Sequence, residues 1–158
     1  MTKAELFIPV NVLTRLLDAD IETGELRWKP RSSDLFAASK TRTAEHICNN
    51  WNSRYAGHLA LNYEDKFGHL CGRIFSRLIY AHRAIFAIAH RDWPRQSIDH
   101  INGIPTDNRL CNLRDVSHKI NLRNQSMSST NTTGITGVYW NKNRSKWVAA
   151  IGVNGRSV

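Results

Sequence analysis

The chain has 158 residues, of which 41% are hydrophobic and 22% are charged, a composition typical of a globular protein rather than a disordered one. No apolar run approaches the roughly 18 residues of a membrane span, and the N-terminus lacks the long apolar core of a signal peptide. The three cysteines include no C-x-x-C pair, so we expect free thiols in a reducing cytosol and no structural zinc.

Positive charge is concentrated in the second part of the chain. The net charge is +9, from 22 Lys and Arg against 13 Asp and Glu. Residues 1–66 hold nine basic and nine acidic side chains, which leaves thirteen basic (22 − 9) and four acidic ones (13 − 9) for residues 67–158. A positive field of this kind suits a polyanion such as nucleic acid, although many basic proteins bind none.

The N-terminal region is predicted to combine a helix with a strand. Apolar residues recur at helical spacing over residues 7–18, which predicts a short amphipathic helix. The sequence Glu22-Thr23-Gly24 then indicates a turn, and residues 25–29 indicate a strand. Residues 30–56 are polar with scattered aromatic side chains, and we expect irregular structure there with one helical turn.

The middle of the chain is predicted to form paired strands followed by a helix. Short runs at residues 58–63, 67–74 and 77–80 are separated by brief breaks and predict strands. Residues 81–90 are apolar with good helix formers and end before Trp93-Pro94, which predicts a helix.

Residues 96–125 are predicted to fold as strand, loop, strand and helix. The strands are expected at residues 96–101 and 113–116, with a polar loop at residues 102–109 between them. Ser117 is a suitable N-cap for a helix that runs to about residue 125.

The C-terminal part is predicted to be a linker and a hairpin. Residues 126–136 are almost wholly small and polar, as in a linker. Residues 137–140 and 146–153 alternate aromatic or aliphatic residues with polar ones, which predicts two strands. Asn154-Gly155 then indicates a tight turn toward a further strand.

The polar side chains of residues 97–125 suggest phosphodiester hydrolysis, which needs a base for the attacking water and a group that absorbs charge. Asp99 and His100 are neighbours at the end of a predicted strand, so their side chains diverge and can do different work. Asp99 is a hard oxygen donor suited to Mg²⁺, and His100 can take a proton from water near neutral pH. Asn121 could add a neutral oxygen to the same ion, and Asn112 could hold His100 in one tautomer.

Each of these residues also has a purely structural alternative. Asparagine-rich loops are often simple turns, so Asn102-Gly103 or His100 alone would indicate no chemistry. His82 fits a hydrogen-bonded core histidine at a helix start better than a phosphate contact. Arg83 beside it fits a phosphate clamp, with an exposed salt bridge as the alternative. The nuclease interpretation therefore depends on the whole set and its spacing.

A longer pattern runs through the same segment. It consists of Asp99-His100-Ile101-Asn102-Gly103, Asp107-Asn108-Arg109, Asn112-Leu113-Arg114, Asn121 and Asn124, preceded by Tyr80-Ala81-His82-Arg83, Trp93-Pro94 and Glu22-Thr23-Gly24-Glu25-Leu26-Arg27-Trp28. This pattern resembles the HNH motif of phage-borne homing endonucleases, which belong to the ββα-metal (His-Me finger) nucleases. The resemblance covers most of residues 7–125.

The resemblance implies an α+β fold with a ββα-metal HNH core, a small α/β region before it and a short β-hairpin DNA-binding tail after it. By the same resemblance, His100 is the general base, Asp99 and Asn121 are the metal ligands, and Asn112 orients His100. The final histidine of the motif is replaced by Asn121, which implies one Mg²⁺ or Mn²⁺ per site and no structural zinc. Cleavage would leave 5′-phosphate and 3′-hydroxyl ends.

The tail carries a second pattern, formed by Tyr139, Trp140, Arg144, Lys146, Trp147 and Arg156. It resembles the three-stranded DNA-binding domain of plant ethylene-response factors, in which a sheet lies in the major groove. The final strand and the packing helix of that domain are missing from the sequence. Trp140 and Trp147 are expected either to contact DNA or to form the core of the remnant.

Four parts are expected along the chain: an N-terminal recognition or support region (residues 1–66), an HNH nuclease domain (67–125), a linker (126–136) and a truncated β-sheet DNA-binding module (137–158). Contacts that position a DNA duplex are expected from Arg83, Arg109, Arg114, Lys119, Arg123, Lys142, Arg144, Lys146 and Arg156.

The sequence therefore predicts a homing-type, metal-dependent endonuclease that hydrolyses double-stranded DNA as a monomer or dimer, in the cytoplasm of a phage's bacterial host. The alternative from another class is a DNA-binding regulator that keeps a vestigial HNH scaffold. A colicin-like toxin nuclease fits less well, because no immunity or translocation region is apparent in so short a chain.

Overall fold

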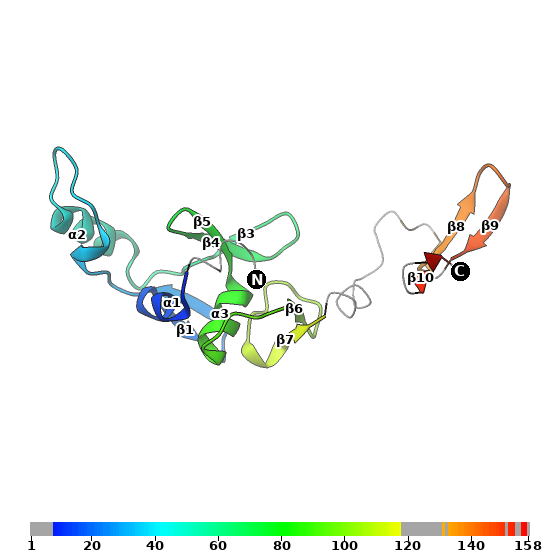
Figure 1. The fold of residues 1–158 in the computed structure, drawn as a ribbon, viewed down its shortest axis with the longest axis horizontal. Helices are drawn as coiled ribbons and strands as arrows, with labels where there is room; N and C mark the ends of the chain where they lie inside the picture. Colours follow the sequence, from blue (N-terminus) through cyan, green and yellow to red (C-terminus); the bar gives the residue numbers. More distant parts are fainter. Residues whose placement is uncertain (1–7, 118–130, 132, 151, 154–155, 158) are drawn as a thin grey trace. The chain divides into compact units, whose positions relative to one another are not determined.

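The fold is taken from a computed structural model, which describes residues 8–117, 131, 133–150, 152–153 and 156–157. The chain divides into two compact units, Met1–Asn121 and Leu122–Val158, and each is considered by itself (Figure 1). Helices and small antiparallel sheets alternate along the described residues. The predicted α+β class is therefore confirmed.

The first unit begins with helix α1 (Val10–Leu16), followed directly by the hairpin of strands β1 (Leu17–Asp20) and β2 (Glu25–Trp28). The predicted strand is confirmed, but the predicted helix was too long. Leu17 pairs with Trp28 across the hairpin, and this pairing buries the Leu17 side chain in the core. The run of apolar residues thus extends past the end of α1, because Leu17, the first residue of β1, is buried in the same core.

The turn between β1 and β2 packs directly against a distant loop. Its Gly24 has a φ of +77°, and a Cβ built there would lie 2.5 Å from the backbone nitrogen of Arg109 and 2.5 Å from the carbonyl carbon of Asn108. Beside this contact, the backbone N–H of Leu110 donates to the carbonyl of Ile21 (2.9 Å). Only glycine allows both the left-handed backbone and this close approach.

Helix α2 (Ala44–Tyr55) corrects the expectation of irregular structure for residues 30–56. Thr43 caps it, because its hydroxyl accepts from the backbone N–H of His46 (3.2 Å). Cys48 is its single buried residue, so the sequence shows almost no apolar periodicity there. A short 3₁₀ turn, η2 (Ser33–Leu35), contacts α2.

A three-stranded antiparallel sheet follows, made of β3 (Tyr63–Glu64), β4 (Leu70–Ile74) and β5 (Arg77–Tyr80). The strand predicted at residues 77–80 is found with the same bounds, and the one predicted at residues 67–74 is shorter than expected. The strand predicted at residues 58–63 is wrong, because β3 begins only at its last residue and Leu59 forms no more than an isolated bridge with Arg27. The turn between β4 and β5 is Phe75-Ser76, with φ values of 48° and 64°. Two positive φ values suit the twist of a two-residue hairpin.

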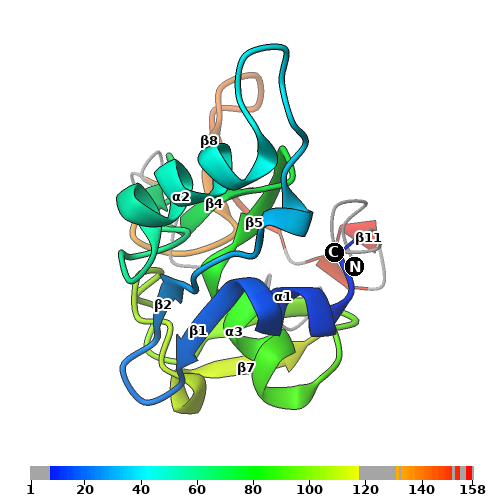
Figure 2. The same cartoon turned by 90° about the vertical axis from the view of Figure 1, so that its left-hand side faces the viewer.

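Helix α3 (Ala81–His90) has the predicted bounds and forms the centre of the unit. It contacts α1, β4 and β5, and Figure 2 shows α1 and α3 side by side. Ala84, Ile85 and Ala87 are fully buried on it. Beyond it, the indole Nε1–H of Trp93 donates to the carbonyl of Ile8 (2.8 Å), which ties the start of the described chain to the core.

Strands β6 (Ser97–His100) and β7 (Leu113–Val116) form an antiparallel pair beside α3, with a long loop and the 3₁₀ turn η3 (Leu110–Asn112) between them. Both strands were predicted, the second with the same bounds. The helix predicted over residues 117–125 falls almost wholly outside the described residues.

The second unit contains two small hairpins. Strands β8 (Val138–Asn141) and β9 (Lys146–Ala149) pair with each other, as do β10 (Gly152–Val153) and β11 (Arg156–Ser157). The β8–β9 hairpin agrees with the prediction, but the single strand predicted over residues 146–153 is divided into β9 and β10, which pair with different strands. The turn residues 154–155 and most of the predicted linker lie outside the described residues. None of the helices in the described part of the chain is long and apolar enough to cross a membrane.

The Gly24 contact yields a stability test. Replacing Gly24 with Ala forces a Cβ into the backbone of Asn108 and Arg109, in addition to the strain of a positive φ. Gly57 has a similar φ of +79°, but a Cβ at that position would meet nothing within 4 Å, so Gly57→Ala is the matched control. We expect Gly57→Ala to lower the free energy of unfolding by about 1 kcal/mol and Gly24→Ala by at least about 2 kcal/mol more. Urea denaturation measures both, and equal losses would contradict the close contact.

Candidate functional site

His100 occupies the last position of β6, at the start of the loop that leads to β7. Its side chain is buried, and its Nε2 lies 3.1 Å from Oδ1 of Asn108. Because an amide oxygen only accepts, Nε2 carries the proton and Nδ1 carries the lone pair. The hydrogen bond therefore holds the imidazole in one tautomer, as a general base requires.

Burial keeps this imidazole neutral. Desolvation lowers the pKa of His100 below its ordinary value; the hydrogen bond with Asn108 raises it, and the neighbouring His69 lowers it further. The ring centre of His82 lies 5.2 Å from that of His100, and burial is the main reason that the pKa of His82 falls to about 3. Both imidazoles are therefore neutral at neutral pH, and His100 is in the form that accepts a proton.

Side-chain hydrogen bonds hold the loop between β6 and β7. Asn112 Nδ2 donates to Asn102 Oδ1 (3.0 Å) and to the carbonyl of Asp107 (2.8 Å), and Asn112 Oδ1 accepts from the backbone N–H of Asn102 (3.0 Å). The Asp107 carboxylate in turn accepts from the guanidinium of Arg109 at 2.6 and 2.8 Å. These bonds shape the loop so that Asn108, only 1% exposed, faces His100.

The side chain that contacts the imidazole is thus Asn108, whereas the sequence assigned the orienting role to Asn112. The Asn112 amide bonds to Asn102 and Asp107 and acts on His100 only through the loop. Spacing along the chain does not show which asparagine turns inward, because the path of the loop also depends on the packing of residues 108–109 against Gly24.

Asp99, the expected metal ligand, faces its register partner Arg114 on β7. Arg114 donates to Oδ2 of Asp99 from both Nε (2.8 Å) and Nη2 (2.6 Å), and the two side chains are 42% and 12% exposed. A cation at Asp99 must therefore share or displace this guanidinium. Asn121, the expected second ligand, lies outside the described residues. Within the described ranges, no group of three His, Cys, Asp or Glu side chains is placed to hold a metal ion.

Two further imidazoles surround His100. The ring centre of His69 lies 5.8 Å from that of His100 and 5.3 Å from that of His82. His82 is buried, as expected of a core histidine, and its Nδ1 has no hydrogen-bond partner among the described residues. Sequence reasoning missed His69; the usable signal was the pairing of β4 with β5, which brings His69 next to the residues that lead into α3.

Arg83 does not lie where a phosphate clamp would need it. It is buried, and its guanidinium donates to the backbone oxygens of Gln96 (2.8 Å) and Pro94 (3.0 Å). Arg83 thus connects α3 to the residues before β6. Its guanidinium is used inside the fold, so we no longer expect Arg83 to contact DNA. Its position at the buried face of α3 explains this, because neighbouring Ala84 and Ile85 pack into the same core.

The remaining phosphate contacts expected from residues 1–125 divide into two groups. Arg109 and Arg114 are partly exposed, and each is paired with a carboxylate of the site, Asp107 or Asp99. The side-chain hydrogen bonds and charge of Asp107 raise the pKa of Arg109 above its ordinary value. Lys119 and Arg123 lie outside the described residues.

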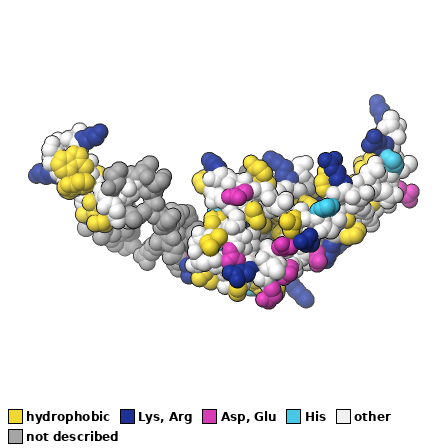
Figure 3. All heavy atoms as spheres, turned by 180° about the vertical axis from the view of Figure 1, so that it is seen from behind, with side chains coloured by type: hydrophobic (Ala, Val, Ile, Leu, Met, Phe, Trp, Pro, Cys, Tyr) yellow, Lys and Arg dark blue, Asp and Glu magenta, His cyan; other side chains and the backbone are white. Residues whose placement is uncertain are grey.

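In the second unit, the β8–β9 hairpin presents an aromatic pair to solvent. Trp140 and Trp147 are register partners with ring centres 5.3 Å apart, and Trp147 is 62% exposed. Lys142, Arg144 and Lys146 are exposed around them. Figure 3 shows this apolar patch on the hairpin flanked by basic side chains. The hairpin by itself therefore does not bury its tryptophans, and the side chain of Arg156 is outside the described residues.

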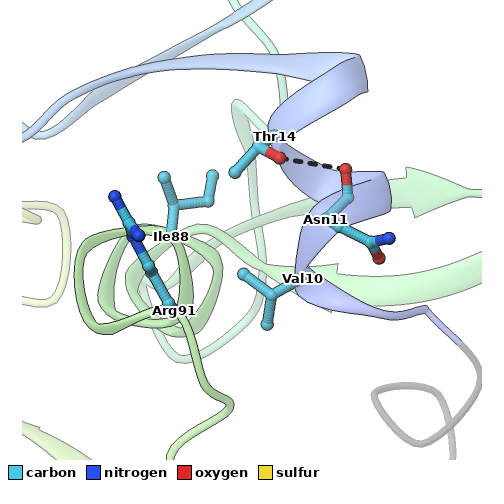
Figure 4. Close-up of a pocket in the computed structure, with 5 residues that line it drawn as sticks. All are labelled: Val10, Asn11, Thr14, Ile88 and Arg91. Atoms are coloured by element: carbon cyan, nitrogen blue, oxygen red, sulfur yellow. Dashed lines mark hydrogen bonds between the residues drawn. The ribbon is translucent and has the colours of Figure 1, made fainter.

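A separate pocket lies between α1 and the end of α3. It is lined by Val10, Asn11, Thr14, Ile88 and Arg91 (Figure 4). None of these residues belongs to the histidine cluster or to the loop that orients it, so we assign the pocket no part in the chemistry of His100.

Comparison with known proteins agrees with the geometry around His100. Residues 79–123 match a family model described as HNH endonuclease. This segment contains α3, β6, β7 and the loop with Asn108. Protein 3.8 of Escherichia phage T7 is 37% identical over 59 residues, which are 37% of this chain and 49% of that protein. The chain thus spans about half the length of the curated relative that it matches. No solved structure matches the chain significantly.

The contact between Asn108 and His100 can be tested by titration. An anionic partner favours the imidazolium, so Asn108→Asp should raise the pKa of His100, whereas Asn108→Ala removes a contact that raises this pKa and should lower it. NMR of the His100 ring protons against pH measures both shifts, with exposed His46 as the internal control. If Asn112→Ala moves the His100 pKa and Asn108→Asp leaves it in place, the orienting residue is Asn112 instead.

Proposed function

We propose that this chain is a metal-dependent DNA endonuclease of the HNH type, in which His100 activates the attacking water. The observation that carries the proposal is the buried and neutral His100, fixed by Asn108 beside Asp99, within the segment that matches the HNH endonuclease family. A neutral imidazole held in one tautomer is what general-base catalysis at neutral pH requires. The net charge of +9 supports a polyanionic substrate.

The reaction follows from the tautomer of His100. Its Nδ1 lone pair takes a proton from a water molecule, and the hydroxide attacks phosphorus in line with the 3′ oxygen. The bond between phosphorus and that oxygen breaks, and the leaving 3′ oxygen takes a proton from solvent water, which leaves a 5′-phosphate and a 3′-hydroxyl end. Asn108 accepts from the opposite nitrogen throughout, and so stabilises the imidazolium that forms.

The donor set suits a hard cation. Asp99 and Asn121 would hold one Mg²⁺ or Mn²⁺, and both offer oxygen, while water and phosphate oxygens complete the coordination. When bound, the ion supplies charge that stabilises the phosphoryl group and the leaving oxygen. Arg114, which holds Asp99 in the structure, would then be available to the DNA backbone as one of the positioning contacts, together with Arg109.

The second unit is proposed to bind the duplex. Its exposed Trp140 and Trp147, with Lys142, Arg144 and Lys146 around them, offer stacking surface and positive charge to DNA. The enzyme is proposed to be of the homing type and to act in the cytoplasm of a bacterial host; the likeness to a phage protein supports the phage origin. Lys119, Arg123 and Arg156 are proposed as further backbone contacts.

A DNA-binding regulator with a vestigial HNH scaffold is the second candidate. The observation that favours it is the ion pair of Asp99 with Arg114, which occupies the expected metal ligand. The exposed aromatic and basic hairpin serves a regulator equally well. A regulator would shift DNA in a gel and leave it intact in the presence of Mg²⁺.

His100→Ala separates these candidates. Without the base, we expect Mg²⁺-dependent cleavage of plasmid or phage DNA to fall by at least about 10²-fold, because general-base catalysis contributes that much, while DNA binding is largely unchanged. Cleavage is followed on agarose gels and binding by gel shift. Exposed His46→Ala is the control and should cut at the wild-type rate. Unchanged cleavage by His100→Ala would remove His100 from the mechanism.

The proposed metal ligand gives a second test. An ion at Asp99 competes with the guanidinium of Arg114, so Arg114→Gln should strengthen Mn²⁺ binding and Asp99→Asn should weaken it, each by about tenfold. Titration with Mn²⁺ in the absence of DNA, followed by electron paramagnetic resonance, measures the Mn²⁺ affinity of both variants. Arg95→Gln, at an exposed position, is the control. Equal Mn²⁺ affinity in all four proteins would place the metal elsewhere.

A further inference from the structure

His69, which lies beside the buried His100, is partly exposed to solvent. Of the three clustered histidines, His82 and His100 are buried, whereas the side chain of His69 is 32% exposed. The ring centre of His69 is 5.8 Å from that of His100. A phosphate group that reaches His100 from solvent therefore also comes within reach of His69.

His69 is held in place by Asp65. Nδ1 of His69 lies 3.8 Å from Oδ1 of Asp65, so its Nε2 is turned away from the carboxylate. The same Oδ1 accepts from the backbone N–H groups of Phe67 (2.8 Å) and His69 (3.0 Å), and Tyr80 donates its hydroxyl hydrogen to Oδ2 (3.3 Å). Asp65 thus closes a tight turn and fixes His69 at the start of β4.

The Asp65 side chain remains ionised next to His69. Burial alone would raise the pKa of Asp65, but the hydrogen bonds from the backbone N–H groups of His69 and Phe67 and from the Tyr80 hydroxyl together lower it. Either form of the ring that carries a proton on Nε2 can donate toward the site.

The separation of the rings allows both imidazoles to contact one phosphate. In an in-line displacement the attacking water and the leaving oxygen are on opposite sides of phosphorus. In the proposed reaction His100 serves the water, and the bound cation would stabilise the leaving oxygen. With ring centres 5.8 Å apart, His69 lies close enough to His100 to reach a non-bridging oxygen of the same phosphate.

From this geometry we propose that His69, positioned by Asp65, is a second catalytic residue that donates from Nε2 to a non-bridging oxygen of the scissile phosphate. This inference rests on the proposed nuclease function. The hydrogen bond from His69 stabilises the negative charge that develops on that oxygen as the water attacks. No proton needs to be transferred to the phosphate. His82, buried and neutral behind both rings, packs against them without reaching the substrate.

The test uses the full chain and a synthetic duplex that spans a cleavage position mapped first with the wild-type protein. His69→Ala should slow single-turnover cleavage by about 10²-fold, as the loss of one preorganised donor does, with DNA binding unchanged in a gel shift without metal. His69→Gln keeps an N–H donor at a similar reach and should recover at least tenfold of this loss. Exposed His58→Ala is the matched control and should behave as wild type.

A chemical substitution in the DNA separates a phosphate contact from a structural role. Sulfur accepts hydrogen bonds weakly, so each non-bridging oxygen of the cleaved linkage is replaced by sulfur in turn. One of the two diastereomers should slow the wild-type protein but slow His69→Ala much less, because the contact is already lost. A cation on the other oxygen affects both proteins equally and cancels in this comparison.

The outcomes are distinct. Wild-type rates for His69→Ala, or equal sulfur effects in wild type and His69→Ala with no recovery by Gln, overturn the role of His69 and leave His100 as the proposed base. A wild-type protein that cuts no DNA with Mg²⁺ or Mn²⁺ overturns the nuclease proposal and this inference together.

Discussion

The hydrogen bond between Nε2 of His100 and Oδ1 of Asn108 joins two buried side chains. Asn108 is placed by a loop that Asn112 clamps from within and that Gly24 meets from the β1–β2 turn. Because Gly24 allows the backbone of residues 108–109 to approach so closely, the N-terminal hairpin and the loop after β6 form one packed structure. The tautomer of His100 thus depends on residues more than seventy positions earlier in the chain.

The same arrangement separates the roles of the charged groups. Burial and neighbouring rings keep His100 and His82 neutral, whereas the carboxylates of Asp65 and Asp107 are stabilised by hydrogen bonds and remain charged. Asp107 and its partner Arg109 hold the loop, and Asp65 holds the turn that carries His69. The base is thus neutral, and the guanidinium groups of Arg109 and Arg114 beside it can attract a phosphate without protonating it.

Strong local patterns predicted their elements well. Helix α3 and strands β5 and β7 have the bounds expected from the sequence, because each combines high intrinsic preference with burial on a regular face. Helix α2 was missed since Cys48 is its single buried residue, and Leu17 was assigned to a helix because its buried face continues that of α1.

The candidate site was predicted only in part, for a physical reason. Local spacing brought Asp99 and His100 to one strand end, but their partners are chosen by contacts between distant segments. Asn108 faces inward because of the loop path, Asp99 meets Arg114 because of strand register, and Arg83 turns into the core with its helix. His69 lies at the site because β4 pairs with β5, and no local sequence motif predicts this position.

The central claim is that water activated by His100 attacks a DNA phosphodiester. The most direct measurement is cleavage of plasmid DNA by the wild-type chain with Mg²⁺ in water enriched in oxygen-18, followed by mass spectrometry of the ends. The account predicts one heavy oxygen on each new 5′-phosphate and unlabelled 3′-hydroxyl ends. DNA that stays intact, or ends that carry a 3′-phosphate or no heavy oxygen, would contradict it.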